Sequence, residues 1–239
     1  MKKKKLAIVT IHKGNLKNLI KTIKSIDRQT EFPDLHVVII NHLGFNHSQI
    51  FNRKNRKIII SKDRSLWHAM NIGLKHTFDY NLLFLNSGDE FYSNHSVSWI
   101  KRNICGIKCL ILKTALIKKK SIFLPKSNFF LKKIYSPHPS FIRPPIIKKL
   151  YFQEEPKTFA DGIWMQKNRD LYNFKKRDKI LSKFYLHGGS STYSSFTSIK
   201  WQFNFKFIEG IKEIIKFILL RVFGNNYYKF IYFQKFKKK

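Results

Sequence analysis

Apolar positions along the first half of the chain follow two alternating patterns. Short, continuous apolar runs occupy residues 6–11, 37–40, 58–60 and 82–85. Runs of this kind are typical of strands that are buried on both faces of a sheet. Between them, residues 15–26 and 66–76 place apolar side chains three and four positions apart, which is the spacing of an amphipathic helix. Strands that alternate with helices predict an α/β fold around a mostly parallel, doubly wound sheet.

After residue 95 this alternation is weaker. We expect a helix over residues 95–104 and a strand over residues 107–112, and we expect the basic and aromatic residues 117–136 to form a loop or a β-ribbon. The sequence contains no internal repeat and no flexible linker. We therefore expect one domain over residues 1–198, followed by a separate tail over residues 199–239.

The tail combines one helical stripe with a basic, aromatic end. The stripe consists of Ile208, Ile211, Ile215, Ile218 and Val222. Residues 227–239 interleave aromatic side chains with lysines, a pattern that suits the boundary between lipid tails and anionic headgroups. The tail is therefore predicted to lie on an anionic membrane surface. A single apolar stripe is equally suited to packing on the domain or on a second subunit.

The charge of the chain favours an anionic partner. Lysine and arginine total 47 against 14 acids, which gives a formal net charge of +33. Such a field is suited to nucleic acid, to an anionic membrane or to phosphorylated substrates. A/T-rich codon usage also raises the number of lysines without any selected partner, and both explanations stay open. Nucleic acid is the least favoured partner, because the lysines are spread along the chain and no recognition motif accompanies them.

Cysteine usage and hydropathy bear on the compartment. The two cysteines, Cys105 and Cys109, are too few for a disulfide framework and lack further zinc ligands, so a reduced cytosolic compartment is expected. The apolar run at residues 6–11 is too short for a signal peptide and is read as a strand. No uncharged apolar run approaches the roughly 18 residues of a membrane-spanning helix.

A polar turn directly follows the apolar run at residues 82–85. It reads Asn-Ser-Gly-Asp and ends at Asp89. Ligands of open α/β sheets bind outside the carboxyl ends of the strands, so we expect Asp89 to meet a ligand or a metal ion. The alternative is an aspartate that only forms a turn.

Two stretches together resemble a known family. Residues 63–73 read Asp-Arg-Ser-Leu-Trp-His-Ala-Met-Asn-Ile-Gly, and residues 86–89 read Asn-Ser-Gly-Asp. Their joint pattern resembles the nucleotide-sugar half of family 2 glycosyltransferases, most of all the bacterial colanic-acid and O-antigen type. The resemblance extends over roughly residues 4–195 and implies the GT-A fold.

The resemblance also implies an activity. The expected reaction moves a sugar, with inversion, from a nucleotide-diphosphate donor to a polysaccharide, lipid-linked or lipopolysaccharide-type acceptor, and a UDP-sugar is the favoured donor. We expect the protein to act in the cytoplasm, at the inner face of the cell membrane.

The resemblance assigns residues to the donor side. These are Thr10, Asn41, Asp63, Arg64, Asn71, Ser87 and Asp89. Asp89 is the expected ligand of a divalent cation, Mn²⁺ or Mg²⁺, that neutralises the leaving diphosphate. Relatives carry an Asp-x-Asp here, but Ser87 replaces the first acid. Asn41 likewise stands where relatives carry an acid.

On the acceptor side, Asp161 is the expected general base, because Ala160-Asp161 resembles a family motif at the start of a helix. The alternative role for Asp161 is a helix cap. His138 and His187 are assigned to the acceptor or phosphate side. Ile163 replaces a second family acid. These three replacements, at Asn41, Ser87 and Ile163, leave an alternative open: the protein is a degenerate glycosyltransferase that serves as an assembly partner.

Overall fold

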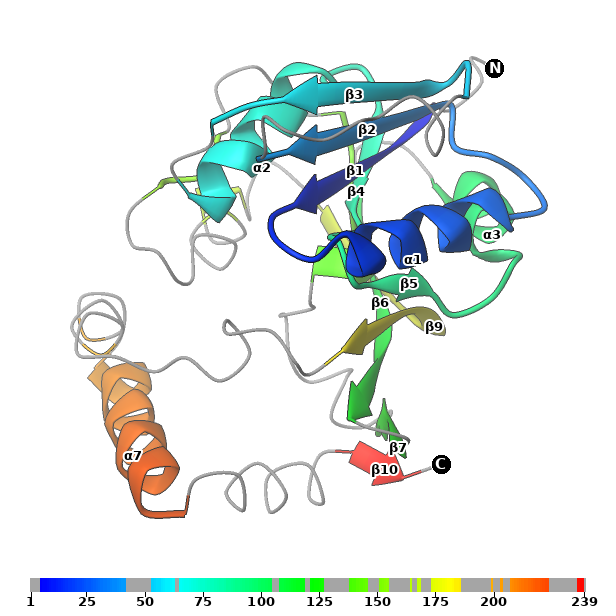
Figure 1. The fold of residues 1–239 in the computed structure, drawn as a ribbon. Helices are drawn as coiled ribbons and strands as arrows, with labels where there is room; N and C mark the ends of the chain where they lie inside the picture. Colours follow the sequence, from blue (N-terminus) through cyan, green and yellow to red (C-terminus); the bar gives the residue numbers. More distant parts are fainter. Residues whose placement is uncertain are drawn as a thin grey trace.

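The structure is a computed structural model of the 239-residue chain. It describes residues 5–41, 53–62, 65–104, 108–118, 121–126, 138–145, 151–154, 164, 167–168, 173–185, 199, 203, 207–223 and 236–238. In this part of the chain, the strands join in one ten-stranded sheet with helices on both faces (Figure 1).

The first half of the chain forms the parallel part of the sheet. Its strands are β1 (Leu6–His12), β2 (Leu35–Ile40), β3 (Arg56–Ile60) and β4 (Asn81–Phe84). They lie in the order β4-β1-β2-β3, and each neighbouring pair is parallel. Every residue of β1 and β4 is buried, as expected for strands covered on both faces. The predicted parallel sheet is confirmed here.

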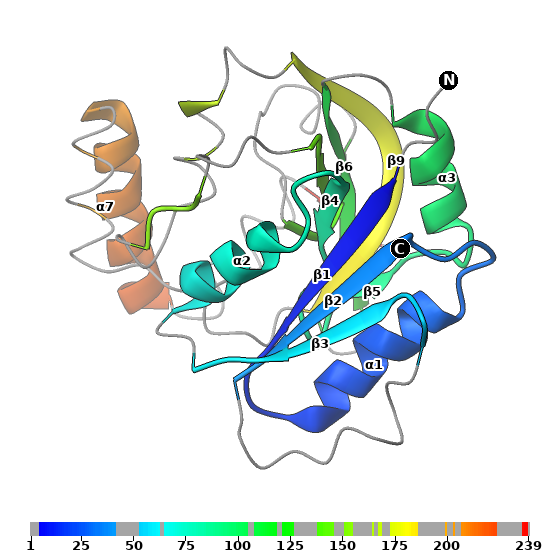
Figure 2. The ribbon, with the colours of Figure 1, turned by 90° about the horizontal axis from the view of Figure 1, so that it is seen from above.

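Helices cover both faces of these strands. α1 (Leu16–Asp27) and α3 (Ser96–Asn103) lie on one face, and α2 (Leu66–Lys75) lies on the other (Figure 2). Alternate residues of a strand point to opposite faces. In β1 the odd-numbered apolar residues therefore pack in a core with α2, and the even-numbered ones pack on the side of α1 and α3.

The helices begin where the sequence supplies caps. The side chain of Asn15 accepts a hydrogen bond from the backbone N–H of Lys17 at the start of α1, and Ser65 accepts one from His68 at the start of α2. Such caps satisfy donors that have no partner within the helix.

The second half of the sheet is mixed. Its strands are β5 (Glu90–Phe91), β6 (Lys108–Lys118), β7 (Ser121–Pro125), β8 (Phe141–Arg143), β9 (Asn173–Tyr185) and β10 (Phe236–Lys238). β8 is antiparallel to β4 and β6, whereas β9 is parallel to β6. The connection between β6 and β7 is two residues long, which only an antiparallel pair allows. The sheet as a whole is therefore mixed, and the run of purely parallel neighbours is confined to the first half.

The tail contributes a helix and a strand. α7 (Phe207–Phe223) contains the predicted apolar stripe. β10 pairs with β7 and forms the edge of the sheet, so the described end of the tail belongs to the sheet. None of the helices in the described part of the chain has the length and hydropathy that a bilayer-crossing helix needs.

Candidate functional site

The carboxyl ends of three parallel strands meet at one edge of the sheet. Asn41 directly follows β2, and its backbone N–H donates to the carbonyl of His12, the last residue of β1, at 3.1 Å. Ser87 follows β4, and its backbone N–H donates to the carbonyl of Ile11 at 3.0 Å. The Ser87 hydroxyl and Nδ1 of His12 are 3.0 Å apart. The structure thus brings Asn41 and Ser87 to the same edge, with His12 between them.

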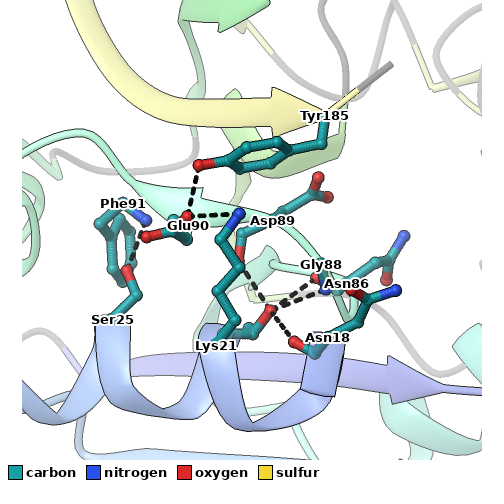
Figure 3. Close-up of polar contacts among 10 residues, drawn as sticks. Asn18, Lys21, Ser25, Asn86, Gly88, Asp89, Glu90, Phe91 and Tyr185 are labelled. Carbon is teal, nitrogen blue, oxygen red and sulfur yellow. Dashed lines mark hydrogen bonds and ion pairs between the residues drawn. The ribbon is translucent and has the colours of Figure 1, made fainter. Parts of the chain in front are cut away.

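The turn at residues 86–89 is fixed by the first helix. Gly88 has a φ of 102°, which glycine adopts without strain. Its N–H donates to the Thr22 hydroxyl at 2.9 Å, and this hydroxyl donates to the carbonyl of Asp89 at 2.7 Å. The backbone N–H of Asp89 closes the turn onto the carbonyl of Asn86 at 2.9 Å. The Asp89 backbone therefore does form a turn, as the alternative from the sequence proposed, but its side chain takes no part in it (Figure 3).

Two side chains of this turn, those of Asp89 and Asn86, carry oxygen acceptors without a partner among the described residues. Asp89 is 6% exposed, and its carboxylate forms no hydrogen bond or ion pair with the residues that the structure describes (Figure 3). Burial raises the pKa of Asp89 well above its usual range, Lys21 opposes that shift and Glu90 adds to it. The side-chain oxygen Oδ1 of Asn86 is also buried with no hydrogen-bond partner in the described part of the chain. A polar group left in this state is costly unless a ligand satisfies it.

The donor chemistry fits a hard cation. Carboxylate and amide oxygens are the ligands that Mg²⁺ and Mn²⁺ prefer. No three His, Cys, Asp or Glu side chains gather into a metal-binding group within the described residues. Asp89 and Asn86 would therefore hold a cation only together with substrate phosphates and water, as is usual for Mg²⁺.

A second polar cluster borders Asp89. Lys21 Nζ lies 2.9 Å from Glu90 Oε1, and the Tyr185 hydroxyl donates to the same oxygen at 2.6 Å (Figure 3). Lys21 Nζ also lies 3.0 Å from the centroid of the Tyr185 ring. Burial acts to lower the pKa of Lys21, but the hydrogen bonds that its ammonium makes to Tyr185 and Glu90, together with the negative charge of Glu90, outweigh it and raise that pKa. The cluster therefore holds the positively charged ammonium group of Lys21 beside the buried carboxylate of Asp89.

Nothing in the sequence pointed to this cluster. Tyr185 lies 95 residues after Glu90, and the two meet only because β5 pairs with β9. The ion pair to Lys21 joins α1 to β5 in the same way. The signal available from the sequence was the single acid Glu90 directly after Asp89.

Two other predicted donor-side residues have partners within the protein. Thr10 is fully buried in β1, and its hydroxyl is 3.0 Å from Nε2 of His36. The side-chain amide of Asn71 donates to the carbonyl of Phe152 at 2.9 Å and accepts from its N–H at 2.8 Å. Asn71 therefore braces residues 151–154 against α2. Contact of either residue with a nucleotide stays a prediction.

His138 lies in a buried aromatic and cationic cluster. Arg143 is fully buried, and its guanidinium lies 4.2 to 5.5 Å from the centroids of four rings, those of Phe84, Phe141, Phe152 and Trp164. Its Nη2 is 3.2 Å from Nδ1 of His138. Because a guanidinium only donates, Nδ1 accepts and Nε2 carries the ring proton. A role for His138 toward an acceptor stays a prediction.

Four of the residues expected in the site lie outside the described residues. These are Asp63, Arg64, Asp161 and His187.

Comparison with known proteins identifies the fold. No family model and no curated protein matches the sequence. Solved structures do match. S. aureus TarS 1–349 in complex with UDP-GlcNAc gives a TM-score of 0.62 at 18% identity, over 83% of this chain and 64% of that chain. The complex of TarS 1–349 with UDP gives 0.59 at 18% identity, over 84% and 66%. The mannosyltransferase PcManGT from Pyrobaculum calidifontis, in complex with GDP-Man and Mn²⁺, gives 0.55 at 10% identity, over 89% and 64%.

These likenesses concern the fold. The chain spans 66% or less of the length of these three structures. At such low identity, structural likeness does not carry an activity from one protein to another. The chain has the α/β fold of GT-A-type glycosyltransferases, with helices on both faces of a mixed sheet.

Proposed function

We propose that this protein is a glycosyltransferase that moves a sugar from a nucleotide-diphosphate donor to a surface-polysaccharide or lipopolysaccharide-type acceptor, with inversion. One observation carries the proposal. The buried carboxylate of Asp89 and the buried Oδ1 of Asn86 have no partner among the described residues, and they lie at the carboxyl edge of the parallel strands. Ligands of open α/β sheets bind at this edge.

The donor side rests on the turn at residues 86–89. A divalent cation, Mn²⁺ or Mg²⁺, supplies positive charge against which a nucleoside diphosphate leaves. Asp89 and Asn86 would hold it, and Lys21 keeps a fixed positive charge beside them. The neighbours solved with UDP, with UDP-GlcNAc and with GDP-Man and Mn²⁺ support a nucleotide-sugar donor. We favour a UDP-sugar.

The acceptor side rests on Asp161, which we propose as the base that takes the proton of the attacking hydroxyl. Two described residues flank it in the chain. Phe152 is held by Asn71 and packs against Trp67, with ring centroids 5.5 Å apart. Trp164 packs against Phe141 at 6.0 Å. Phe152 and Trp164 both belong to the aromatic cluster that contains His138, the other described residue proposed for the acceptor side.

Nucleotide binding tests the donor side. We expect UDP with Mn²⁺ to raise the melting temperature of the wild-type protein more than UDP alone, because the cation links Asp89 to the diphosphate. The Asp89→Ala variant should lose the effect of Mn²⁺. The matched control is Asp79→Ala, which removes an exposed aspartate that directly precedes Tyr80 and β4. An unchanged response of Asp89→Ala would contradict the proposed site.

Transfer tests the activity separately. With a UDP-sugar and Mn²⁺, the wild-type protein should release UDP by transfer or by slow hydrolysis, and Asp89→Ala should not. A protein that binds UDP and Mn²⁺ but never releases UDP from the sugar donors would instead be a degenerate glycosyltransferase that serves as an assembly partner.

A further inference from the structure

α7 presents a continuous apolar face to solvent. Six large apolar side chains of this helix are exposed, by 40% to 70%: Phe207, Ile208, Ile211, Ile215, Ile218 and Val222. At 3.6 residues per turn they fall within an arc of about 100° around the helix axis. Monomeric proteins rarely expose contiguous apolar surface of this kind, and such surface usually marks an interaction site.

Charged residues border this face but do not interrupt it. At helical spacing, Lys212 lies beyond one edge of the arc and Arg221 lies beyond the other. The guanidinium of Arg221 lies 4.9 Å from the centroid of the Phe217 ring. An apolar face with basic residues along both borders is the pattern of a helix that lies in the plane of a membrane surface.

Phe203, which shortly precedes α7 in the chain, contacts the helix mainly beside the apolar arc. Gly210 is buried, and a Cβ atom added there would lie 2.5 Å from the ring of Phe203. The rings of Phe203 and Phe207 also meet, with centroids 5.6 Å apart. Phe203 thus covers α7 along Gly210 and touches the apolar arc at its edge, at Phe207, while the six side chains of the arc stay exposed. In both views of the fold, α7 lies apart from the sheet (Figures 1 and 2).

We propose that α7 docks this apolar face onto an anionic lipid bilayer and lies flat at headgroup depth. The net charge of the chain decides which of three partners fits this face: a membrane, a second copy of the chain or nucleic acid. The chain has a formal net charge of +33, so an anionic membrane attracts it, whereas a second copy would bring two strongly positive fields together. Nucleic acid has the right charge but offers no apolar surface for the arc. Within the described residues, α7 also lacks the length and hydropathy that a bilayer-crossing helix needs.

The proposal does not depend on the transfer reaction. If both hold, a membrane-seated α7 keeps the candidate site close to a lipid-linked acceptor and accounts for a location on the inner face of the cell membrane. The end of the tail is not part of this surface, because Phe236–Lys238 pair with β7.

Vesicle flotation with the full chain tests the proposal. The wild-type protein should float with vesicles of phosphatidylcholine and phosphatidylglycerol, bind vesicles of phosphatidylcholine alone far more weakly, and be released in part by salt. Ile215→Glu should weaken binding to the anionic vesicles about tenfold or more, because it places a charge in the middle of the apolar face. Ile60→Glu is the matched control. Ile215 and Ile60 are 50% and 44% exposed, and both variants change the net charge equally. Ile60→Glu should bind like the wild type.

Three outcomes would overturn the proposal. One is equal flotation of Ile215→Glu and Ile60→Glu. Another is equal binding of the wild type to neutral and anionic vesicles. The third is a wild-type dimer in solution that Ile215→Glu converts to a monomer with no change in flotation, which would assign the face to a second copy. Should Ile215→Glu fail to fold, Val222→Glu replaces it, since Val222 is 67% exposed.

Discussion

Lys21, Glu90 and Tyr185 show how single residues from distant parts of the chain shape the candidate site. They come from α1, β5 and β9, and they meet at one carboxylate oxygen of Glu90. The hydrogen bonds and the ion pair lower the pKa of Glu90, although burial alone would raise it. Glu90 therefore stays ionised while the burial of its neighbour Asp89 favours the neutral acid. The pKa values of these two adjacent carboxyl groups thus shift in opposite directions, because only Glu90 has side-chain partners among the described residues.

The Tyr185 hydroxyl can be tested by itself. Tyr185→Phe keeps the ring against Lys21 but removes the donor to Glu90, so the free energy of unfolding should fall by about 1 kcal/mol in urea denaturation. Tyr92→Phe is the matched control. Tyr92 follows β5, and no hydrogen bond joins its hydroxyl to a described residue. If both variants lose the same stability, the hydrogen bond to Glu90 contributes nothing specific.

At the scale of elements, a buried histidine joins the edge strand β3 to the rest of the sheet. Nε of Arg56, the first residue of β3, donates to Nδ1 of His36 in β2 at 2.9 Å. Nε2 of His36 must then carry the proton, and it donates to the Thr10 hydroxyl in β1 at 3.0 Å. Arg56 in turn pairs with Asp27 of α1. Burial first, and then Arg56 and Arg53, hold the pKa of His36 well below its ordinary value.

This histidine makes stability depend on pH. His36 is neutral in the folded state but takes up a proton in the unfolded state below about pH 6.5. The unfolded state then binds more protons, so stability is full above this pH and falls by up to about 1.4 kcal/mol per unit as the pH drops further. Urea denaturation between about pH 7 and pH 5 measures the slope. His36→Gln should flatten it relative to wild type, whereas His95→Gln, at an exposed histidine, should leave it unchanged. A slope that is the same in all three proteins would refute the assignment.

The elements that could be predicted from the sequence are those fixed by local pattern. The apolar runs predicted β1, β2 and β4, and the helical spacing predicted α1 and α2. We expected β6 to end at residue 112, because Lys113 interrupts the apolar run. The strand instead extends to Lys118. That lysine is buried and paired with Asp178 of β9, a partner no local pattern reveals.

The residues of the candidate site also fall into two groups, those that a local pattern predicts and those that only long-range pairing brings together. Asp89 followed from an apolar run and the turn after it, which are local signals, and Ser87 followed from the family resemblance. Tyr185 reaches Glu90 only through long-range strand pairing, because β9 pairs with both β5 and β6. A motif match also gave Thr10 and Asn71 a donor role, whereas their side chains bond to His36 and Phe152 within the protein. A motif specifies which residue stands at a position, and the surrounding fold decides which partners its side chain has.

For the whole molecule, the dominant electrostatic feature is the excess of positive charge. Lysine and arginine outnumber the acids by 47 to 14. Five acids form ion pairs with described cations: Asp27, Glu31, Asp34, Glu90 and Asp178. Most cations therefore have no acid to pair with, and their mutual repulsion acts against the compact state. The same field attracts the chain to the anionic membrane proposed as the partner of α7.

Salt should therefore stabilise the isolated protein. Raising NaCl from about 10 mM to about 150 mM shortens the Debye length from about 30 Å to about 8 Å, which screens repulsion between distant cations more than it weakens ion pairs in contact. A gain of about 1 kcal/mol would raise the melting temperature by about 2–4 °C for a chain of this size. The measurement is thermal unfolding in NaCl and in NaF at equal ionic strength, because screening predicts the same rise in both salts whereas binding of one anion predicts a difference. A melting temperature that falls with salt would mean that the ion pairs of the described acids outweigh the repulsion among the lysines.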